Sequence, residues 1–140
     1  MDMDKVRLYA FKAMDFFGEA VSEARNEVQD KAFFDGIEIG IRVTISSLYE
    51  SGVSDEKIIN LLNKYWEIPR QESVDRLRFE KVELCKRELR EYLILQGWSS
   101  KDVNSYYRKQ MIGAKIRNNK ELWGLWSKPE KLKQEIEKLQ

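Results

Sequence analysis

Apolar residues recur at intervals of three and four along almost the whole of this 140-residue chain. That spacing follows the turn of an α-helix and gathers the apolar side chains on one face. Long helices are expected from Asp4 to Val28, from about Gln71 to Gln96, and again after Gly97. We therefore predict an all-α fold with about six helices in one compact helix-hairpin bundle, as a single domain over residues 1–140.

Residues 37–45 fit two structures. Isoleucine and valine alternate with polar residues or glycine, as in a half-buried strand. The same stretch puts Ile37, Ile41 and Ile45 on one helical face, and no other segment supplies a partner strand for the backbone groups. We favour the helix, in which Gly36 and Gly40 would let a neighbouring helix approach closely.

Two similar corners separate the helices, Gly52-Val53-Ser54 and Gly97-Trp98-Ser99. Glycine is favoured just after a helix and serine just before one, so each corner indicates the end of one helix and the start of the next. A shift of 45 residues also aligns Leu48 with Leu93 and Ile58 with Val103. Either a duplicated helix–Gly-x-Ser–helix unit or two independent uses of the same capping residues explains this match.

Residues 36–62 resemble the helical tail segments of the PD-(D/E)XK transposase-nuclease family. The shared features are the glycine-spaced run from Gly36 to Gly40 and the Gly52-Val53-Ser54 corner ahead of Ile58 and Leu62. The resemblance implies that this segment is helical. It implies no activity, because the strands, acids and lysine of that family's nuclease core have no counterpart in this chain.

The composition removes most enzyme classes. The chain has no histidine and one cysteine, so it cannot assemble a histidine-based triad, a His-containing zinc site or a cysteine zinc cluster. Cys85 lies among apolar residues and is expected to be buried. We expect a non-enzyme with no metal and no cofactor. Catalysis through lysine or carboxylates would need a pocket joining Arg78, Lys81 and Glu88.

The N-terminus lacks the basic and apolar regions of a secretory signal, and no run of residues is apolar enough to span a membrane. A cytoplasmic protein is expected. Its charge is uneven: residues 1–70 carry 9 basic and 13 acidic side chains, and residues 71–140 carry 16 and 11. The acidic half has a net charge of −4 and the basic half +5, which suits the second half to a negatively charged partner.

The strongest surface signal is a basic stripe on the helix after Gly97. Lys101, Arg108 and Lys115 recur every seven residues, opposite a buried face that includes Tyr106, Tyr107 and Met111. Asn104 lies between them, Lys109 alongside, and Arg117 and Lys120 extend the charge. Such a stripe could bind phosphates or an acidic protein surface, although a solvated basic face is the simpler interpretation.

Arg70, Gln71 and Ser73 would open the recognition helix if the first corner belonged to a helix-turn-helix. Glu72 and Asp75 would then face phosphates, so helix packing is favoured there. The aromatic residues near the basic stripe are expected to fill the core, although stacking on exposed bases is their alternative use: Trp98, Tyr106, Tyr107, Trp123 and Trp126. Ser127 and Glu130 fit a capping box for a last helix that docks near the tryptophans.

These features predict a non-enzymatic helical binding protein that docks onto a macromolecular partner, an acidic protein surface or a nucleoprotein. An accessory or regulatory role of the kind found in bacteria or mobile elements is expected, and a homodimer fits this interpretation. The alternative is a helix-turn-helix-like nucleic-acid-binding protein that uses the basic stripe on phosphates.

Overall fold

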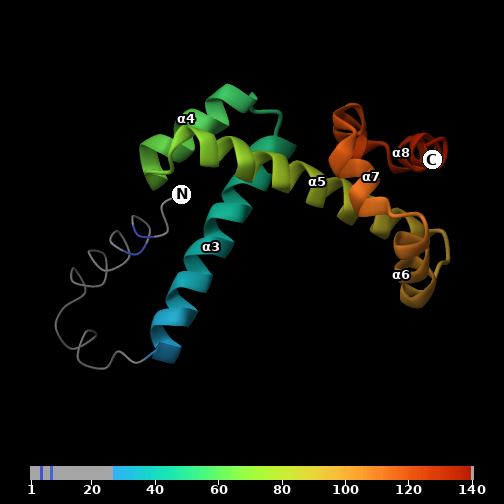
Figure 1. Cartoon of the computed structure of the whole chain (residues 1–140), viewed down its shortest axis with the longest axis horizontal. Helices are drawn as coiled ribbons and strands as arrows, with labels where there is room; N and C mark the ends of the chain where they lie inside the picture. Colours follow the sequence, from blue (N-terminus) through green and yellow to red (C-terminus); the bar gives the residue numbers. More distant parts are fainter. Residues whose placement is uncertain (1–3, 5–6, 8–26, 140) are drawn as a thin grey trace. The chain divides into compact units, whose positions relative to one another are not determined.

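A computed structural model of the chain describes Asp4, Arg7 and residues 27–139 (Figure 1). The helix expected from Asp4 to Val28 lies almost wholly outside these residues. Within them the chain forms seven helical segments and no strand, which confirms the all-α prediction for this part of the molecule. None of these helices is long and apolar enough to cross a membrane. The chain divides into two compact units, Met1–Leu77 and Arg78–Gln140.

The first unit contains α3 (Glu27–Glu50), α4 (Asp55–Trp66) and the beginning of α5 (Arg70–Leu95). Residues 37–45 are helical, as favoured over the strand. Their alternating apolar residues divide between two sides of the helix, because Ile41 and Ile45 are fully buried while Ile39 and Val43 are 61% and 58% exposed. A strand would have placed all four on one face.

The core of the first unit is aliphatic and joins its three helices. Its buried members are Ile41, Ile45, Ile58, Ile59, Leu62, Ile68 and Leu77. A Cβ on Gly40 would lie 3.7 Å from the Trp66 side chain, so this glycine faces α4, whereas the corresponding space at Gly36 is open. Close approach of a helix at both glycines was predicted, but within the described residues a Cβ would fit at either position, in ordinary contact with the Trp66 ring at Gly40 and in open space at Gly36.

Both predicted corners have the same backbone geometry. Gly52 and Gly97 adopt left-handed conformations, with φ of 83° and 98°. In each corner the N–H of the glycine and the N–H of the next residue donate to carbonyl oxygens of the preceding helix. In the first corner Gly52 donates to Tyr49 and Val53 to Leu48. In the second, Gly97 donates to Ile94 and Trp98 to Leu93. This pair of bonds is the Schellman motif. Ser54 and Ser99 then cap the helices that follow, as predicted.

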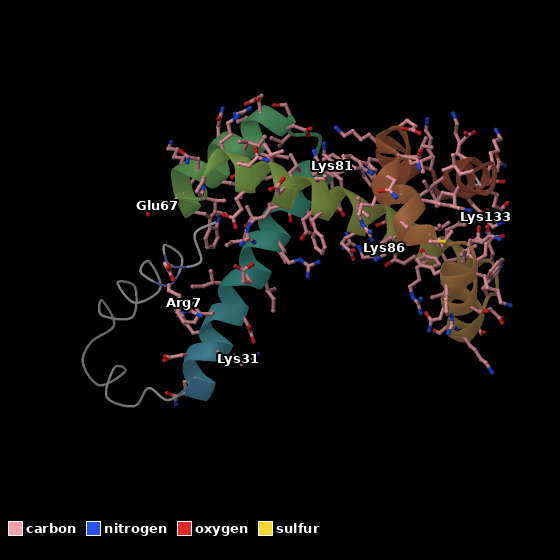
Figure 2. All side chains as sticks on the ribbon, in the orientation of Figure 1. Arg7, Lys31, Glu67, Lys81, Lys86 and Lys133 are labelled. Carbon is pink, nitrogen blue, oxygen red and sulfur yellow. The ribbon has the colours of Figure 1, made fainter. Side chains whose placement is uncertain are left out.

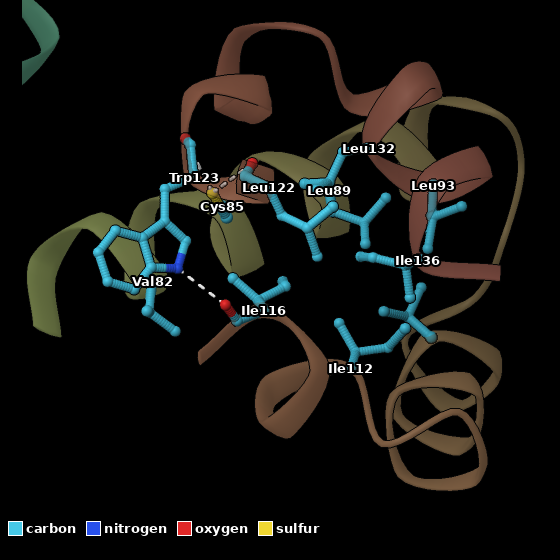
Figure 3. Close-up of a cluster of buried hydrophobic side chains, with 11 residues drawn as sticks. Val82, Cys85, Leu89, Leu93, Ile112, Ile116, Leu122, Trp123, Leu132 and Ile136 are labelled. Carbon is cyan, nitrogen blue, oxygen red and sulfur yellow. Dashed lines mark hydrogen bonds between the residues drawn. The ribbon is translucent and has the colours of Figure 1, made fainter. Parts of the chain in front are cut away.

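The second unit contains the rest of α5, α6 (Ser100–Lys109), α7 (Ile112–Asn118), the 3₁₀-helix η1 (Lys120–Ser127) and α8 (Pro129–Glu137). Their apolar faces enclose a second core, in which Trp123 donates its indole N–H to the Ile116 carbonyl at 2.8 Å (Figure 3). The buried residues of this core are Val82, Cys85, Leu89, Leu93, Val103, Ile112, Ile116, Leu122, Trp123, Leu132 and Ile136.

The last helix docks near the tryptophans as expected, since Leu132 and Ile136 are fully buried in the core that contains Trp123. The capping box predicted for it is wrong. Ser127 ends η1, and α8 starts at Pro129 with Lys128 in the N-cap position and no side-chain cap. The tryptophan-rich segment forms its own 3₁₀ turns, and these include Ser127, the residue predicted to cap the next helix.

Candidate functional site

The basic residues singled out from the sequence lie on α6, α7 and the start of η1. We call residues 100–120 the basic segment. It carries six basic side chains and one acidic one, Asp102, so it accounts for most of the net charge of +6 on residues 78–140. Residues 1–77 have a net charge of −5, so the sign of the charge changes where the structure divides into its two units. The six cations are Lys101, Arg108, Lys109, Lys115, Arg117 and Lys120.

The basic segment does not form the single helix that was predicted. Met111, between α6 and α7, adopts a left-handed conformation with φ of 52°. This interrupts the helix, and α7 starts at the next residue. Met111 itself is 63% exposed, whereas the sequence pattern placed it on the buried face. Gly113 lies inside α7, so the break between the two helices does not fall at a glycine. Lys101 and Arg108 therefore belong to one helix and Lys115 to another, and the straight stripe with seven-residue spacing is not present.

Five cations of the basic segment are exposed: Lys101, Arg108, Lys109, Arg117 and Lys120. None of the five forms an ion pair with any described residue. Several cations elsewhere in the described chain have carboxylate partners, among them Lys31 with Asp35, Lys86 with Glu83 and Lys133 with Glu137 (Figure 2). The described residues thus leave most of the positive charge of the basic segment unneutralised.

Two other predicted site residues are engaged within the unit. Asn104 accepts a hydrogen bond from Arg90 of α5 at 2.7 Å. Lys115 is half-buried, lies 3.4 Å from the Gln110 side-chain oxygen, and contributes electrostatically to the lowered pKa of Glu137. These contacts make Asn104 and Lys115 less available to a partner than the five exposed cations.

The tyrosines of α6 fix this helix to its neighbours. The Tyr106 hydroxyl donates to Glu137 of α8 at 2.9 Å, and the Lys133 ammonium lies 5.6 Å from the Tyr106 ring centre. The Tyr107 hydroxyl donates to the Lys86 carbonyl oxygen of α5. Burial raises the pKa of both phenols. Both tyrosines pack against the second core, as predicted.

A groove lies where α6 leaves the second corner. It has a volume of about 470 Å³ and is lined by residues 96–98 of the corner and by Asp102, Ser105, Tyr106 and Lys109 of α6. The rings of Trp98 and Tyr106 meet edge to face at 5.2 Å between centres. No sequence pattern indicates this groove, because it depends on the direction in which α6 leaves the corner.

The three residues predicted to open a recognition helix lie at the start of α5 and differ in exposure and in bonding partners. The Ser73 side chain is fully buried and donates to the Ile68 carbonyl, so it is not presented to a partner. Arg70 is exposed but makes a two-pronged ion pair with Glu56, which lowers the pKa of that carboxyl. Gln71 is exposed and bonds Asp75 one turn later. This segment is better suited to joining α4 and α5 than to reading bases.

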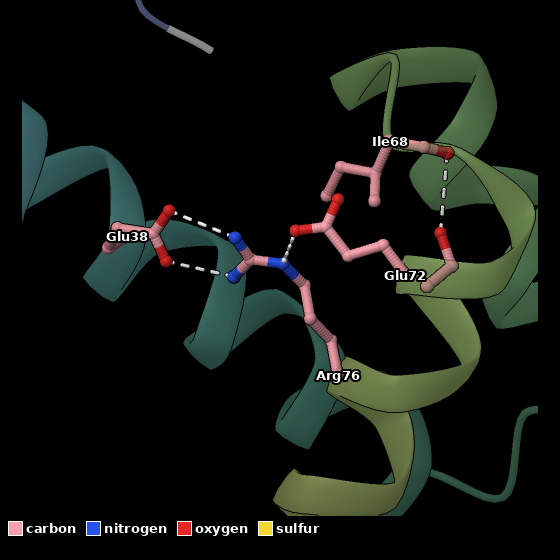
Figure 4. A network of polar contacts seen from close by, with 5 residues as sticks. Glu38, Ile68, Glu72 and Arg76 are labelled. Carbon is pink, nitrogen blue, oxygen red and sulfur yellow. Dashed lines mark hydrogen bonds and ion pairs between the residues drawn. The ribbon is translucent and has the colours of Figure 1, made fainter. Parts of the chain in front are cut away.

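Arg76, which no sequence pattern indicates, forms a network of polar contacts in the first unit (Figure 4). Its guanidinium meets both carboxylate oxygens of Glu38 on α3, at 2.8 and 3.0 Å, and Glu72 of α5 at 3.2 Å. The hydrogen bond to Glu38 is the largest of the contributions that raise the Arg76 pKa. The network fixes α5 to α3. It could not be inferred from sequence, because Glu38 and Arg76 are 38 residues apart.

The remaining candidates from the sequence are Cys85 and the set of Arg78, Lys81 and Glu88. Cys85 is fully buried, and burial raises the pKa of its thiol to about 12. On α5, Arg78 is exposed, while Lys81 and Glu88 are half-buried. The Lys81 ammonium lies 6.0 Å from the Trp123 ring centre. In the part of the chain that the structure describes, no group of three or more cysteine, aspartate or glutamate side chains could hold a metal ion.

Comparison with protein-family models, curated proteins and solved structures finds no match to this chain.

Proposed function

We propose that this chain is a non-enzymatic binding protein of an accessory or regulatory kind, whose basic segment docks onto an acidic surface of a protein or nucleoprotein. The observation that supports this proposal is the set of five exposed cations without an ion pair among the described residues. Like charges held close together repel, so a segment of this kind gains most from a partner that supplies the opposite charge.

The helical framework favours docking as a rigid surface. Capping by Ser99 and the two tyrosine hydroxyl bonds fix α6, and the fully buried Ile112 and Ile116 fix α7. A partner would meet cations whose helices are already ordered, so the entropy lost on binding is largely that of the side chains.

Direct nucleic-acid binding is the second candidate, favoured by the geometry of the second corner. Helices α5 and α6 are joined by residues 96–99, a short turn with a glycine, which is typical of a helix-turn-helix. Two features weigh against it. Asp102 puts a carboxylate in the first turn of the would-be recognition helix, and Asn104 is already bonded to Arg90.

Titrations of the purified protein with poly-L-glutamate, duplex DNA and single-stranded DNA, each at low and moderate salt, separate the two candidates. Docking onto acidic proteins predicts salt-sensitive binding of polyglutamate that is at least as tight as DNA binding. A nucleic-acid binder would prefer DNA and lose affinity with a logarithmic slope near −0.9 per phosphate contacted on the duplex. Absence of binding to all three polyanions at low salt would contradict both candidates, because electrostatic attraction is then strongest.

A further inference from the structure

We infer that the groove between the second corner and α6 is a docking site for an acidic protein segment that carries an apolar or aromatic side chain. This inference rests on the proposed function and adds a defined place and partner chemistry to it. The groove belongs entirely to the second unit and is shallow and largely open to solvent. Its volume of about 470 Å³ gives space for a side chain to lie against its lining.

The walls of the groove are held in place by the fold. The Trp98 N–H donates to the Leu93 carbonyl at 3.1 Å, which fixes the corner, and Ser99 caps α6. The Tyr106 hydroxyl donates to Glu137, which restrains the orientation of its ring. A groove with fixed walls binds with little ordering cost.

The chemistry of the lining changes along the groove. Asp102 and Lys109 lie seven residues apart on α6, about 10 Å along the helix axis, with Ser105 and Tyr106 between them. Lys109 forms no ion pair with a described residue. The groove therefore offers a cation at one end, a carboxylate at the other, and an aromatic wall formed by Trp98 and Tyr106.

A polypeptide fits this order of groups better than a nucleic acid does. Its side-chain carboxylates can pair with Lys109 and the adjacent Arg108, its apolar side chain can lie against the aromatic wall, and its backbone N–H groups can donate to Asp102. A nucleic-acid strand has a phosphate at every nucleotide, so one of them would approach the Asp102 carboxylate.

The test uses the full chain and three probes. The first is a labelled peptide with one phenylalanine flanked by glutamates on a Gly-Ser background, the second has lysines in place of the glutamates, and the third is oligothymidylate. Nitrogen–proton correlation spectra identify the binding place, since the Trp98 indole and the amides of residues 96–109 report on the groove. We expect the glutamate peptide to shift these signals and the lysine peptide to leave them unchanged.

A variant that fills the groove without altering any charge separates this inference from the proposed function. Ser105→Phe should weaken binding of the glutamate peptide about tenfold. The matched control, Ser100→Phe, adds the same side chain at an exposed position of α6 outside the groove and should leave the affinity unchanged. If Ser105→Phe fails to fold, Lys109→Gln is measured instead. This variant removes the cation of the groove with a smaller change in volume and should also weaken binding of the glutamate peptide.

Three results would overturn the inference. Shifts confined to residues 115–120 would leave the proposed function standing and remove the groove as the docking site. Shifts of the groove signals by oligothymidylate but not by the glutamate peptide would assign the groove to nucleic acid. No shift from the glutamate peptide anywhere in the chain would contradict the groove and the proposed function together.

Discussion

Arg76 of α5 meets both carboxylate oxygens of Glu38 on α3, with the Arg76 side chain only 17% exposed. A two-pronged pair in this setting joins the helices of the first unit more firmly than an exposed pair can. Arg76→Ala should lower the free energy of unfolding by about 3 kcal/mol, because Glu38 and Glu72 are then left without their shared cation. Chemical denaturation followed by circular dichroism measures this loss.

The matched control for Arg76 is Arg70→Ala. Arg70 also makes a two-pronged pair, with Glu56, but both side chains are more than half exposed. Water and salt screen such a pair, so its removal should change stability little. Equal losses in the two variants would show that burial does not distinguish these ion pairs.

Alanine at either corner glycine should destabilise the protein. Gly52 and Gly97 have left-handed φ angles that cost a residue with a Cβ about 1 kcal/mol. Gly36→Ala should instead stabilise by up to about 1 kcal/mol, because Gly36 lies inside α3 and an added methyl group would meet only open space there. Thermal unfolding of the three variants checks the opposite signs, and a loss of stability at Gly36 equal to that at Gly97 would contradict this account.

The Cys85 thiol should be unreactive in the folded protein. It is fully buried, its sulfur lies 3.4 Å from the Trp123 carbonyl oxygen, and burial raises its pKa to about 12. A disulfide reagent at pH 8 should therefore modify it only after addition of denaturant, since the thiolate is the reacting form. Stoichiometric modification of the native protein within minutes would show that the second core opens readily.

Glu137 should make the second unit sensitive to acid. Hydrogen bonds from Lys133 and Tyr106 lower its pKa below the ordinary value of 4.5. A lowered folded-state pKa means that the stabilisation is present above the ordinary value and is lost as the pH falls through the lowered one. Glu137→Gln should thus be less stable than the native sequence at neutral pH, and the difference should shrink below about pH 4. A difference that stays constant from neutral to acid pH would argue against this linkage.

The sequence was sufficient where local chemistry decides the structure. Glycine and serine at the two corners specify a left-handed turn and a helix cap, and both predictions were confirmed. The helix over residues 37–45 could be favoured because a lone strand has no partner for its backbone. The corner predictions need only neighbouring residues, and the helix prediction needs only a search of the sequence for a partner strand.

The sequence was insufficient where tertiary contacts decide. Met111 ends α6 in a left-handed conformation that methionine seldom adopts, so no residue type indicated the break. The bonds of Asn104 to Arg90 and of Tyr106 to Glu137 join residues on different helices. Spacing along one helix therefore could not show which members of the basic stripe remain available.

The most direct test of the proposed docking role is a charge reversal within the basic segment. The variant Lys101→Glu, Arg108→Glu, Arg117→Glu is compared with Lys57→Glu, Lys128→Glu, Lys131→Glu, which reverses three exposed lysines elsewhere and changes the net charge equally. Binding to poly-L-glutamate at low salt is measured for both by fluorescence anisotropy. We predict that the first variant loses binding and the second retains most of it. Equal losses in both variants would contradict the account, because attraction would then depend on net charge alone and not on the basic segment.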